Sequence, residues 1–126
     1  MVIDDDPAML TLHQIIARMN PQIVTCYTSP HPEEAIPYLA DCLLGLYPLP
    51  DLLLLDLNMP VMDGWEVLDA LRQHPEIKIR VAILSSSVDP EDQARASRYP
   101  NVIGYLSKPL DHEKVAWLLN VLQEHS

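Results

Sequence analysis

Residues 52–64 read "LLLLDLNMPVMDG", and this segment carries the clearest evidence for the fold. Leu52–Leu55 form a continuous apolar run, which is typical of a strand covered on both faces. The run leads directly into Asp56, although a carboxylate is costly to bury among apolar side chains. The pattern therefore predicts a buried parallel strand whose last residue is an acid with a specific chemical task.

The segments on either side alternate between strand and helix patterns. Strands are predicted for residues 1–3, 22–27, 52–55, 80–84 and 101–106. Helices are predicted within residues 7–19, 29–46, 65–74, 90–99 and 112–125, with Asp6, Asp89 and Asp111 as N-caps. Five strand–helix units of this kind predict an α/β fold, with a parallel sheet covered by helices on both faces.

Two of the predicted helices carry features that the structure can test. The first has apolar residues with helical spacing at Met9, Leu12, Ile15, Ile16 and Met19. In the second, Pro37 is expected to kink or delay the helix. The apolar segment "CLLGLYPLP", residues 42–50, is expected to be a helix end that folds onto the core, with an interaction surface as the alternative.

The composition excludes several classes of function. The 126 residues suit one domain, and the formal net charge of −10 argues against binding to nucleic acid or anionic lipid. The N-terminus is too acidic for a signal peptide, and no apolar run is long enough to span a membrane. Cys26 and Cys42 are expected to be buried and reduced, and the location is expected to be cytoplasmic.

Polar side chains follow four of the predicted strands at the point where each strand ends. Asp4 and Asp5 follow the first strand, Asp56 the third, Ser85 the fourth and Lys108 the fifth. In a doubly wound parallel sheet, ligands bind beyond these carboxyl ends. We therefore expect the three acids, the hydroxyl and the lysine to meet at one edge.

Close carboxylates repel one another unless protons or a cation intervene. Oxygen ligands suit Mg²⁺, whereas zinc would need histidine or cysteine at these positions. An ionised Asp56 beside Mg²⁺ can attack a phosphoryl group, with Lys108 offsetting charge on the phosphoryl oxygens. Ser85 is then placed to donate to the bound phosphoryl group.

Four motifs in this order resemble the receiver domains of bacterial two-component response regulators, and the single-domain chemotaxis regulator in particular. They are "VIDDDP" at 2–7, "LLLLDLNMPVMDGWEVL" at 52–68, "AILSSS" at 82–87 and "GYLSKPL" at 104–110. The resemblance covers essentially the whole chain. It implies a flavodoxin-like fold with strand order 2-1-3-4-5 and five helices, and a single receiver domain over residues 1–126 without an output domain.

The resemblance also implies a role for each site residue. Asp56 is the phosphoacceptor and Asp5 the more direct Mg²⁺ ligand, with Asp4 as its acidic neighbour. Asn58 lends its backbone carbonyl to the metal, and Lys108 contacts the phosphoryl group.

The remaining implied positions concern the switch between states. Ser85 and Tyr105 are the switch pair, and Lys108–Pro109 is a cis peptide bond. Ser85 stands where threonine is commoner in the family. Gly64 eases the turn after the acceptor, and Asp63 is read as a turn residue.

The implied function is that of a receiver in signal transduction. Asp56 accepts a phosphoryl group from a histidine kinase or a phosphotransfer protein, and the face formed by the fourth helix, fifth strand and fifth helix then changes shape. The downstream target is unknown, and a monomer or weak homodimer is expected. The first strand has just Met1–Ile3 ahead of the acids, which leaves open whether residues precede it.

Two alternatives stand beside this interpretation. One is a Mg²⁺-dependent phosphohydrolase with an aspartyl nucleophile, although Asn58 cannot shuttle a proton as a second aspartate would. The other is a degenerate receiver that acts purely as a binding module, although no acid or lysine of the pattern is lost. All five histidines (His13, His31, His74, His112 and His125) are expected to be surface residues.

Overall fold

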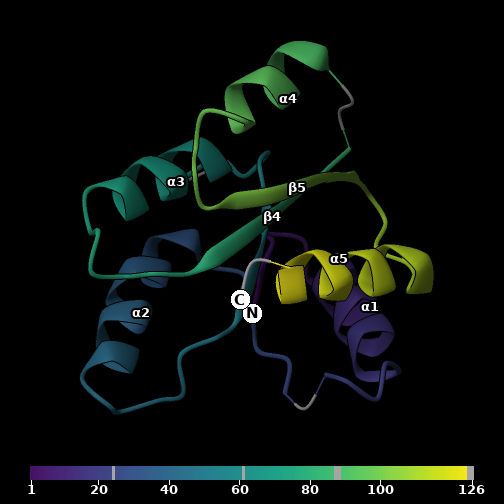
Figure 1. The fold of residues 1–126 in the computed structure, drawn as a ribbon, viewed down its shortest axis with the longest axis horizontal. Helices are drawn as coiled ribbons and strands as arrows, with labels where there is room; N and C mark the ends of the chain where they lie inside the picture. The colour runs from purple at the N-terminus through teal and green to yellow at the C-terminus, as the bar shows by residue number, and fades with distance from the viewer. Residues whose placement is uncertain (24, 61, 87–88, 125–126) are drawn as a thin grey trace.

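The computed structural model contains one five-stranded parallel sheet (Figure 1). It describes residues 1–23, 25–60, 62–86 and 89–124. The strands are β1 (Val2–Ile3), β2 (Thr28–Ser29), β3 (Leu52–Asp56), β4 (Arg80–Ser85) and β5 (Val102–Ser107). Their order in the sheet is β2-β1-β3-β4-β5, as the sequence predicts. The order reverses between β1 and β3, so a doubly wound ligand site is expected at the carboxyl ends of these two strands.

The helices cover both faces of the sheet. They are α1 (Pro7–Arg18), the short 3₁₀ helix η1 (Pro32–Glu34), α2 (Ala35–Leu43), α3 (Gly64–Arg72), α4 (Pro90–Ala96) and α5 (His112–Glu124). Figure 1 shows α1 and α5 together, away from α2, α3 and α4. None of the helices in the described segments is long and apolar enough to cross a bilayer.

Two apolar cores explain the four leucines of β3. Leu53 and Leu55 point into a core shared with α2, α3 and α4, and both are fully buried. Leu54 points the other way, into a core shared with α1 and α5. Because successive side chains of a strand face opposite ways, a strand with helices on both sides needs apolar residues at every position.

Aspartate side chains cap the helices where the sequence predicts them. Asp6 accepts from the backbone N–H of Ala8, Asp89 from Glu91, and Asp111 from Lys114 at 2.8 Å. Asp63 was expected to be a turn residue, but it is the N-cap of α3 and accepts from the N–H of Glu66 at 2.9 Å.

The prediction for the second strand was wrong. Residues 22–27 were expected to form this strand, but β2 comprises just Thr28–Ser29. These two residues pair with Val2 and Ile3 of β1. Of the predicted residues, Tyr27 accepts one backbone hydrogen bond from the N–H of Val2, and Val24 lies outside the described residues. A strand needs a partner, and β1 supplies one over just two residues, so the length of β2 follows from that of β1.

The helix that the apolar spacing predicts after Asp6 is confirmed by α1, but the spacing does not mark its buried side. The buried side chains of this helix are Leu10, His13 and Ala17, whereas Leu12, Ile15 and Met19 are 38%, 53% and 62% exposed. Apolar residues occur on several sides of this helix, so periodicity did not identify the side that packs against the sheet.

The second helix starts late and ends in an exposed segment. Pro37 was expected to kink or delay the helix, and α2 begins only at Ala35, so that Pro37 lies in its first turn, where a missing N–H removes no helical bond. The segment after α2 was expected to fold onto the core. Instead Leu43, Leu44, Leu46, Tyr47 and Leu49 are exposed. The expectation that this segment folds onto the core was therefore wrong.

Candidate functional site

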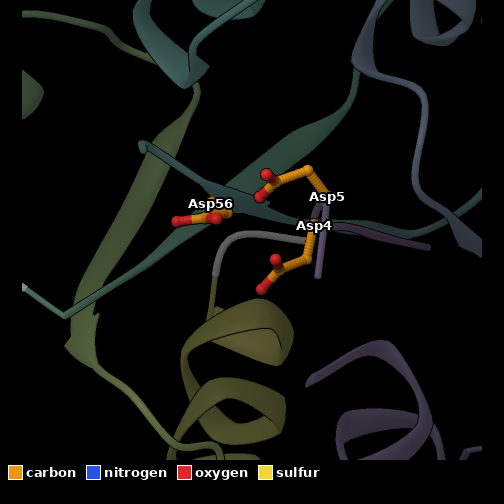
Figure 2. Close-up of side chains that lie close together, drawn as sticks. All are labelled: Asp4, Asp5 and Asp56. Carbon is orange, nitrogen blue, oxygen red and sulfur yellow. The ribbon is translucent and has the colours of Figure 1, made fainter. Parts of the chain in front are cut away.

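Three carboxylates meet where the strand order of the sheet reverses. Asp4 and Asp5 follow β1 directly, and Asp56 is the last residue of β3. One carboxylate oxygen from each lies within 4.8 Å of the others, and Figure 2 shows the side chains converging from the two adjacent strand ends. The sequence prediction that these acids share one edge is confirmed.

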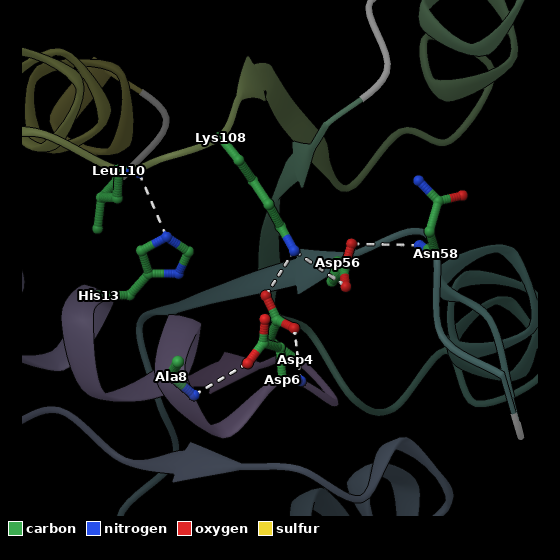
Figure 3. A network of polar contacts seen from close by, with 8 residues as sticks. All are labelled: Asp4, Asp6, Ala8, His13, Asp56, Asn58, Lys108 and Leu110. Carbon is green, nitrogen blue, oxygen red and sulfur yellow. Dashed lines mark hydrogen bonds and ion pairs between the residues drawn. The ribbon is translucent and has the colours of Figure 1, made fainter.

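The lysine after β5 lies between two of these acids (Figure 3). The Nζ atom of Lys108 is 2.6 Å from Oδ2 of Asp4 and 3.1 Å from Oδ2 of Asp56. All three side chains are shielded, with exposed fractions of 14% for Lys108, 2% for Asp4 and 4% for Asp56. Because water is largely excluded, the charges interact more strongly than they would on the surface.

The surroundings shift the pKa values of Asp56 and Lys108. Burial raises the pKa of Asp56, and the neighbouring Asp4 adds to the rise, while Lys108 opposes it. Burial alone would lower the pKa of Lys108, but its hydrogen bonds to Asp4 and Asp56 raise it overall. These contacts favour the charged form of Lys108, whereas ionisation of Asp56 carries a cost that a bound cation would reduce.

The donor set fits a hard cation. Carboxylate oxygens are the ligands that Mg²⁺ prefers, and no histidine or cysteine belongs to this cluster of described residues. Asp4 already uses both oxygens, since Oδ1 accepts from the N–H of Asp6 at 3.0 Å and Oδ2 pairs with Lys108. Asp5 is half-buried and forms neither of these contacts. Asn58 donates its backbone N–H to Oδ1 of Asp56 at 3.2 Å, and its side chain is exposed.

Ser85 and Tyr105 lie on the neighbouring strands. Ser85 is the last residue of β4 and fully buried, and its carbonyl accepts from the N–H of Lys108 at 2.9 Å. Tyr105 is half-buried on β5 and packs against the core that α2, α3 and α4 share. The peptide bond from Lys108 to Pro109 is cis. The second residue after Ser85, residue 87, lies outside the described part of the chain.

A buried histidine next to this site escaped the sequence analysis. His13 was expected at the surface, but it is fully buried on α1. Its Nε2 accepts from the backbone N–H of Leu110 at 3.3 Å, two residues after Lys108 (Figure 3). A signal was present, because residue 13 lies three positions after Leu10 and four before Ala17, on one helical face. His125 lies outside the described residues.

Gly64 also has a role that differs from the predicted one. It was expected to ease a turn, but its φ is not positive, and it is the first residue of α3. A Cβ atom there would lie 2.6 Å from the carbonyl oxygen of Asp56 and 2.9 Å from Cα of Leu57. The glycine therefore lets α3 approach the end of β3 closely.

Comparison with known proteins agrees with this geometry. Residues 1–120 match the family model of the response regulator receiver domain. A two-component response regulator from Cytophaga hutchinsonii is 34% identical, with a TM-score of 0.87 over 98% of this chain and 94% of that chain. The Vibrio cholerae chemotaxis protein CheY4 is 25% identical, with a TM-score of 0.72 over 98% of this chain and 93% of that chain.

Curated relatives include a longer protein. The nitrate/nitrite response regulator protein NarL of Escherichia coli K12 is 36% identical over 113 residues, which are 90% of this chain and 49% of NarL. The chain thus spans about half the length of that relative.

The family match also bears on the alternatives drawn from the sequence. Receiver domains are not enzymes that act on external substrates, so the phosphohydrolase alternative is not supported. The matched region contains the strand-end acids. The chain therefore belongs to the response regulator receiver domain family of two-component signal transduction.

Proposed function

We propose that this receiver accepts a phosphoryl group on Asp56 in a Mg²⁺-dependent reaction, and that the phosphorylated form signals through a changed protein surface. A receiver domain implies a cognate histidine kinase, and a histidine phosphotransfer protein is the other donor of the same chemistry. The observation that carries the proposal is the contact of Lys108 with both Asp4 and Asp56, beside a third carboxylate.

In the proposed transfer, a carboxylate oxygen of Asp56 forms a bond to phosphorus as the bond from phosphorus to the donor histidine nitrogen breaks. The electron pair of the broken bond goes to that nitrogen, which takes up a proton. Lys108 moves from its carboxylate partners to the phosphoryl oxygens and offsets their charge. The buried edge excludes most water, so the acyl phosphate is protected from immediate hydrolysis.

Asp5, Asp56 and the backbone carbonyl of Asn58 would hold the magnesium ion, with Asp4 next to it. The engagement of both oxygens of Asp4 supports Asp5 as the more direct ligand. When bound, the ion supplies positive charge that stabilises the phosphoryl oxygens. It also offsets the repulsion among the three carboxylates.

The proposed output begins at Ser85. Its hydroxyl turns toward the phosphoryl group, and Tyr105 moves into the space beside it. Tyr105 is half-buried on β5, between α4 and α5 in chain order, so its movement alters the α4–β5–α5 face. The phosphoryl group thus favours one of two arrangements of this face, which a target protein then distinguishes.

Phosphorylation can be tested without the cognate kinase. The protein is incubated with acetyl phosphate and Mg²⁺, and its intact mass is measured. A gain of one phosphoryl group is expected for the wild type and for Asp51→Asn, which changes an exposed acid just before β3. No gain is expected for Asp56→Asn or without Mg²⁺. An adduct that persists in Asp56→Asn, or no adduct at all, would contradict the proposal.

A further inference from the structure

The segment after α2 presents apolar side chains to solvent. Leu44 and Leu46 are 77% and 64% exposed, which makes them the most exposed leucines in the described chain. The α2–β3 patch, as we name it, consists of Tyr27, Leu43, Leu44, Leu46, Tyr47 and Leu49. Contiguous exposed apolar residues on a soluble protein commonly mark an interaction site. In Figure 1, α2 and the connection after it run along the outer border of the molecule.

The backbone of the patch is fixed by regular hydrogen bonds. Gly45 has a φ of 84°, its N–H donates to the carbonyl of Cys42, and the N–H of Leu46 donates to the carbonyl of Asp41. These two bonds form a Schellman motif, in which the residue after the glycine usually packs back onto the helix. Leu46 does not pack back, because most of its side chain faces solvent. The cap therefore accounts for Gly45 but not for a leucine at position 46.

Tyrosine rings support the other side of the patch. Tyr47 stacks on Tyr38, with ring centroids 5.2 Å apart, and Tyr38 lies 6.3 Å from Tyr27. Tyr27 and Leu49 also line a hollow of about 300 Å³ at the amino end of the sheet. Rigid aromatic and leucine side chains beside a hollow can bind a partner at a small cost in conformational entropy.

The charges around the patch are acidic. The sequence contains no lysine or arginine between residues 19 and 71. Asp41 precedes the patch, and Asp51 lines the same hollow as Leu49. Within the described part of the chain, neither aspartate forms a salt bridge with a lysine, an arginine or the N-terminus, although the N-terminal ammonium of Met1 lines the same hollow and interacts with Asp51. The charge of Asp41 is therefore available to a positively charged partner, and that of Asp51 is available in part.

We propose that the α2–β3 patch is a docking site for a cationic amphipathic helix of a partner protein. The apolar face of such a helix would cover the exposed leucines, and its lysines or arginines would face Asp41 and Asp51. A second copy of this chain is disfavoured, because a symmetric contact would repeat the same carboxylates on both sides. An anionic membrane surface is disfavoured by the same charges and by the net charge of −10.

The patch lies at the opposite end of β3 from the phosphoacceptor site. Leu49 precedes the strand, and Asp56 is its last residue. Docking here would leave the acidic cluster and the α4–β5–α5 face open. The inference thus goes beyond the proposed function and does not depend on phosphorylation.

The test uses a synthetic probe helix and the full chain without a phosphodonor. The probe carries leucines at positions i, i+3, i+4 and i+7 and lysines elsewhere, and a matched peptide carries glutamates in place of the lysines. Amide shifts of the isotope-labelled protein locate the contact, and calorimetry gives the affinity. With the lysine probe, shifts are expected over residues 41–51 and at Tyr27, and binding is expected to weaken as salt is added.

Two double variants distinguish binding at the α2–β3 patch from nonspecific binding to exposed apolar residues. Leu44→Ser/Leu46→Ser is expected to lower the affinity for the probe by about tenfold or more, because central apolar contacts are lost. Leu12→Ser/Ile15→Ser removes two exposed apolar residues from α1, where no acid lies between residues 7 and 32, and is expected to change affinity by less than about twofold. Thermal melts verify that each variant is folded.

Several results would overturn the proposal. They include equal losses in both double variants, equal binding of the glutamate peptide, and shifts spread over the whole surface. Sedimentation that shows a dimer, lost in Leu44→Ser/Leu46→Ser, would assign the patch to a second copy instead. Binding to neutral phosphatidylcholine vesicles that is lost in the same variant would assign it to lipid.

Discussion

At the residue scale, Asp56 combines burial with a negative charge. It is 4% exposed, and its neighbours include Asp4 as well as Lys108. Burial and Asp4 raise the pKa of its carboxyl, so the ionised form is held at an energetic cost. Such a cost is typical of functional sites, where residues serve a reaction rather than stability.

This cost predicts that Asp56→Asn stabilises the protein when no divalent cation is present. Folding raises the pKa of Asp56, so the folded protein gives up this proton less readily than the unfolded chain does. At pH values where Asp56 is ionised, this difference lowers the free energy of unfolding of the wild type. Removing the charge should therefore raise the free energy of unfolding at pH 7. Urea titration of both proteins in a chelating buffer measures this difference in the free energy of unfolding.

The effect of Asp56→Asn on stability should depend on pH. As pH falls through the raised pKa, the folded wild type takes up a proton, and the advantage of Asp56→Asn should shrink. The exposed Asp51→Asn serves as control and should change stability by less than about 0.5 kcal/mol. A destabilised Asp56→Asn would show that the pair with Lys108 outweighs the repulsion from Asp4.

His13 is the second residue whose surroundings are unusual. Because Nε2 accepts from Leu110, its proton must lie on Nδ1, which has no hydrogen-bond partner among the described residues. Burial lowers the pKa of His13, and nearby Lys108 lowers it further, while Asp4 opposes both. Protonation of Nε2 would place two donors face to face, so the folded state keeps this histidine neutral.

The prediction for His13 concerns acidic pH. Nitrogen shifts of the ring should show the neutral Nδ1–H form at pH values where an ordinary histidine is charged. Below about pH 6.5 the unfolded chain binds a proton that the folded chain does not, so stability should fall by up to about 1.4 kcal/mol per pH unit. His13→Gln should lose this part of the slope. A ring that titrates near its ordinary value would refute the prediction.

At the scale of elements, the close contact between α3 and β3 shapes the site. The N–H of Gly64 donates to the carbonyl of Leu57 at 3.0 Å, and Asp63 caps the helix immediately before it. The backbone that follows Asp56 is therefore fixed by the start of the next helix. Packing of two backbones at this distance leaves no room for a side chain at residue 64.

Gly64→Ala should consequently damage both stability and the site. The added Cβ would lie 2.6 Å from the carbonyl oxygen of Asp56, and the backbone would have to shift. A loss of about 1–3 kcal/mol is expected, as for overpacked cores, together with slower phosphorylation by acetyl phosphate. Urea titration and intact mass measure the two effects.

Gly45→Ala is the matched control for this element. A Cβ at residue 45 would have open space around it, so just the cost of a positive φ, about 1–2 kcal/mol, is expected. Phosphorylation of Gly45→Ala should match that of the wild type, because Gly45 precedes β3, whereas Asp56 is the last residue of this strand. Equal loss of phosphorylation in both variants would refute the local explanation for Gly64.

At the scale of the whole molecule, the fold holds four charged side chains from three strand ends together. Their mutual repulsion is only partly offset by Lys108, so a divalent cation should bind the folded state and not the unfolded chain. Binding of this kind links cation concentration to global stability.

Mg²⁺ should therefore raise the free energy of unfolding of the whole domain. At a concentration about 100 times the dissociation constant the gain is about 2.7 kcal/mol. Thermal melts with and without Mg²⁺ measure it. Asp5→Asn should lose most of the gain, whereas Asp6→Asn should keep it, because Asn can still cap α1. If Asp6→Asn lost the Mg²⁺-dependent gain in stability as fully as Asp5→Asn does, Asp5 would be ruled out as the specific ligand.

Features that depend on neighbours along the chain could be predicted from the residues alone. The N-caps Asp6, Asp89 and Asp111 could be read directly, because a cap bonds to an N–H two or three residues away. The apolar run before Asp56 and the repeated strand–helix pattern determined the parallel sheet. Since parallel strands end at one edge, the meeting of the acids with Lys108 followed as well.

Tertiary structure alone decided which helix faces and which strand residues find partners. The burial of His13, the exposure of Leu12 and the shortness of β2 each depend on where another element lies. Helical periodicity does not identify the side that faces the sheet when apolar residues occur on several sides. The exposed leucines after α2 follow the same rule, because an apolar residue is buried only where a second surface is close enough to cover it.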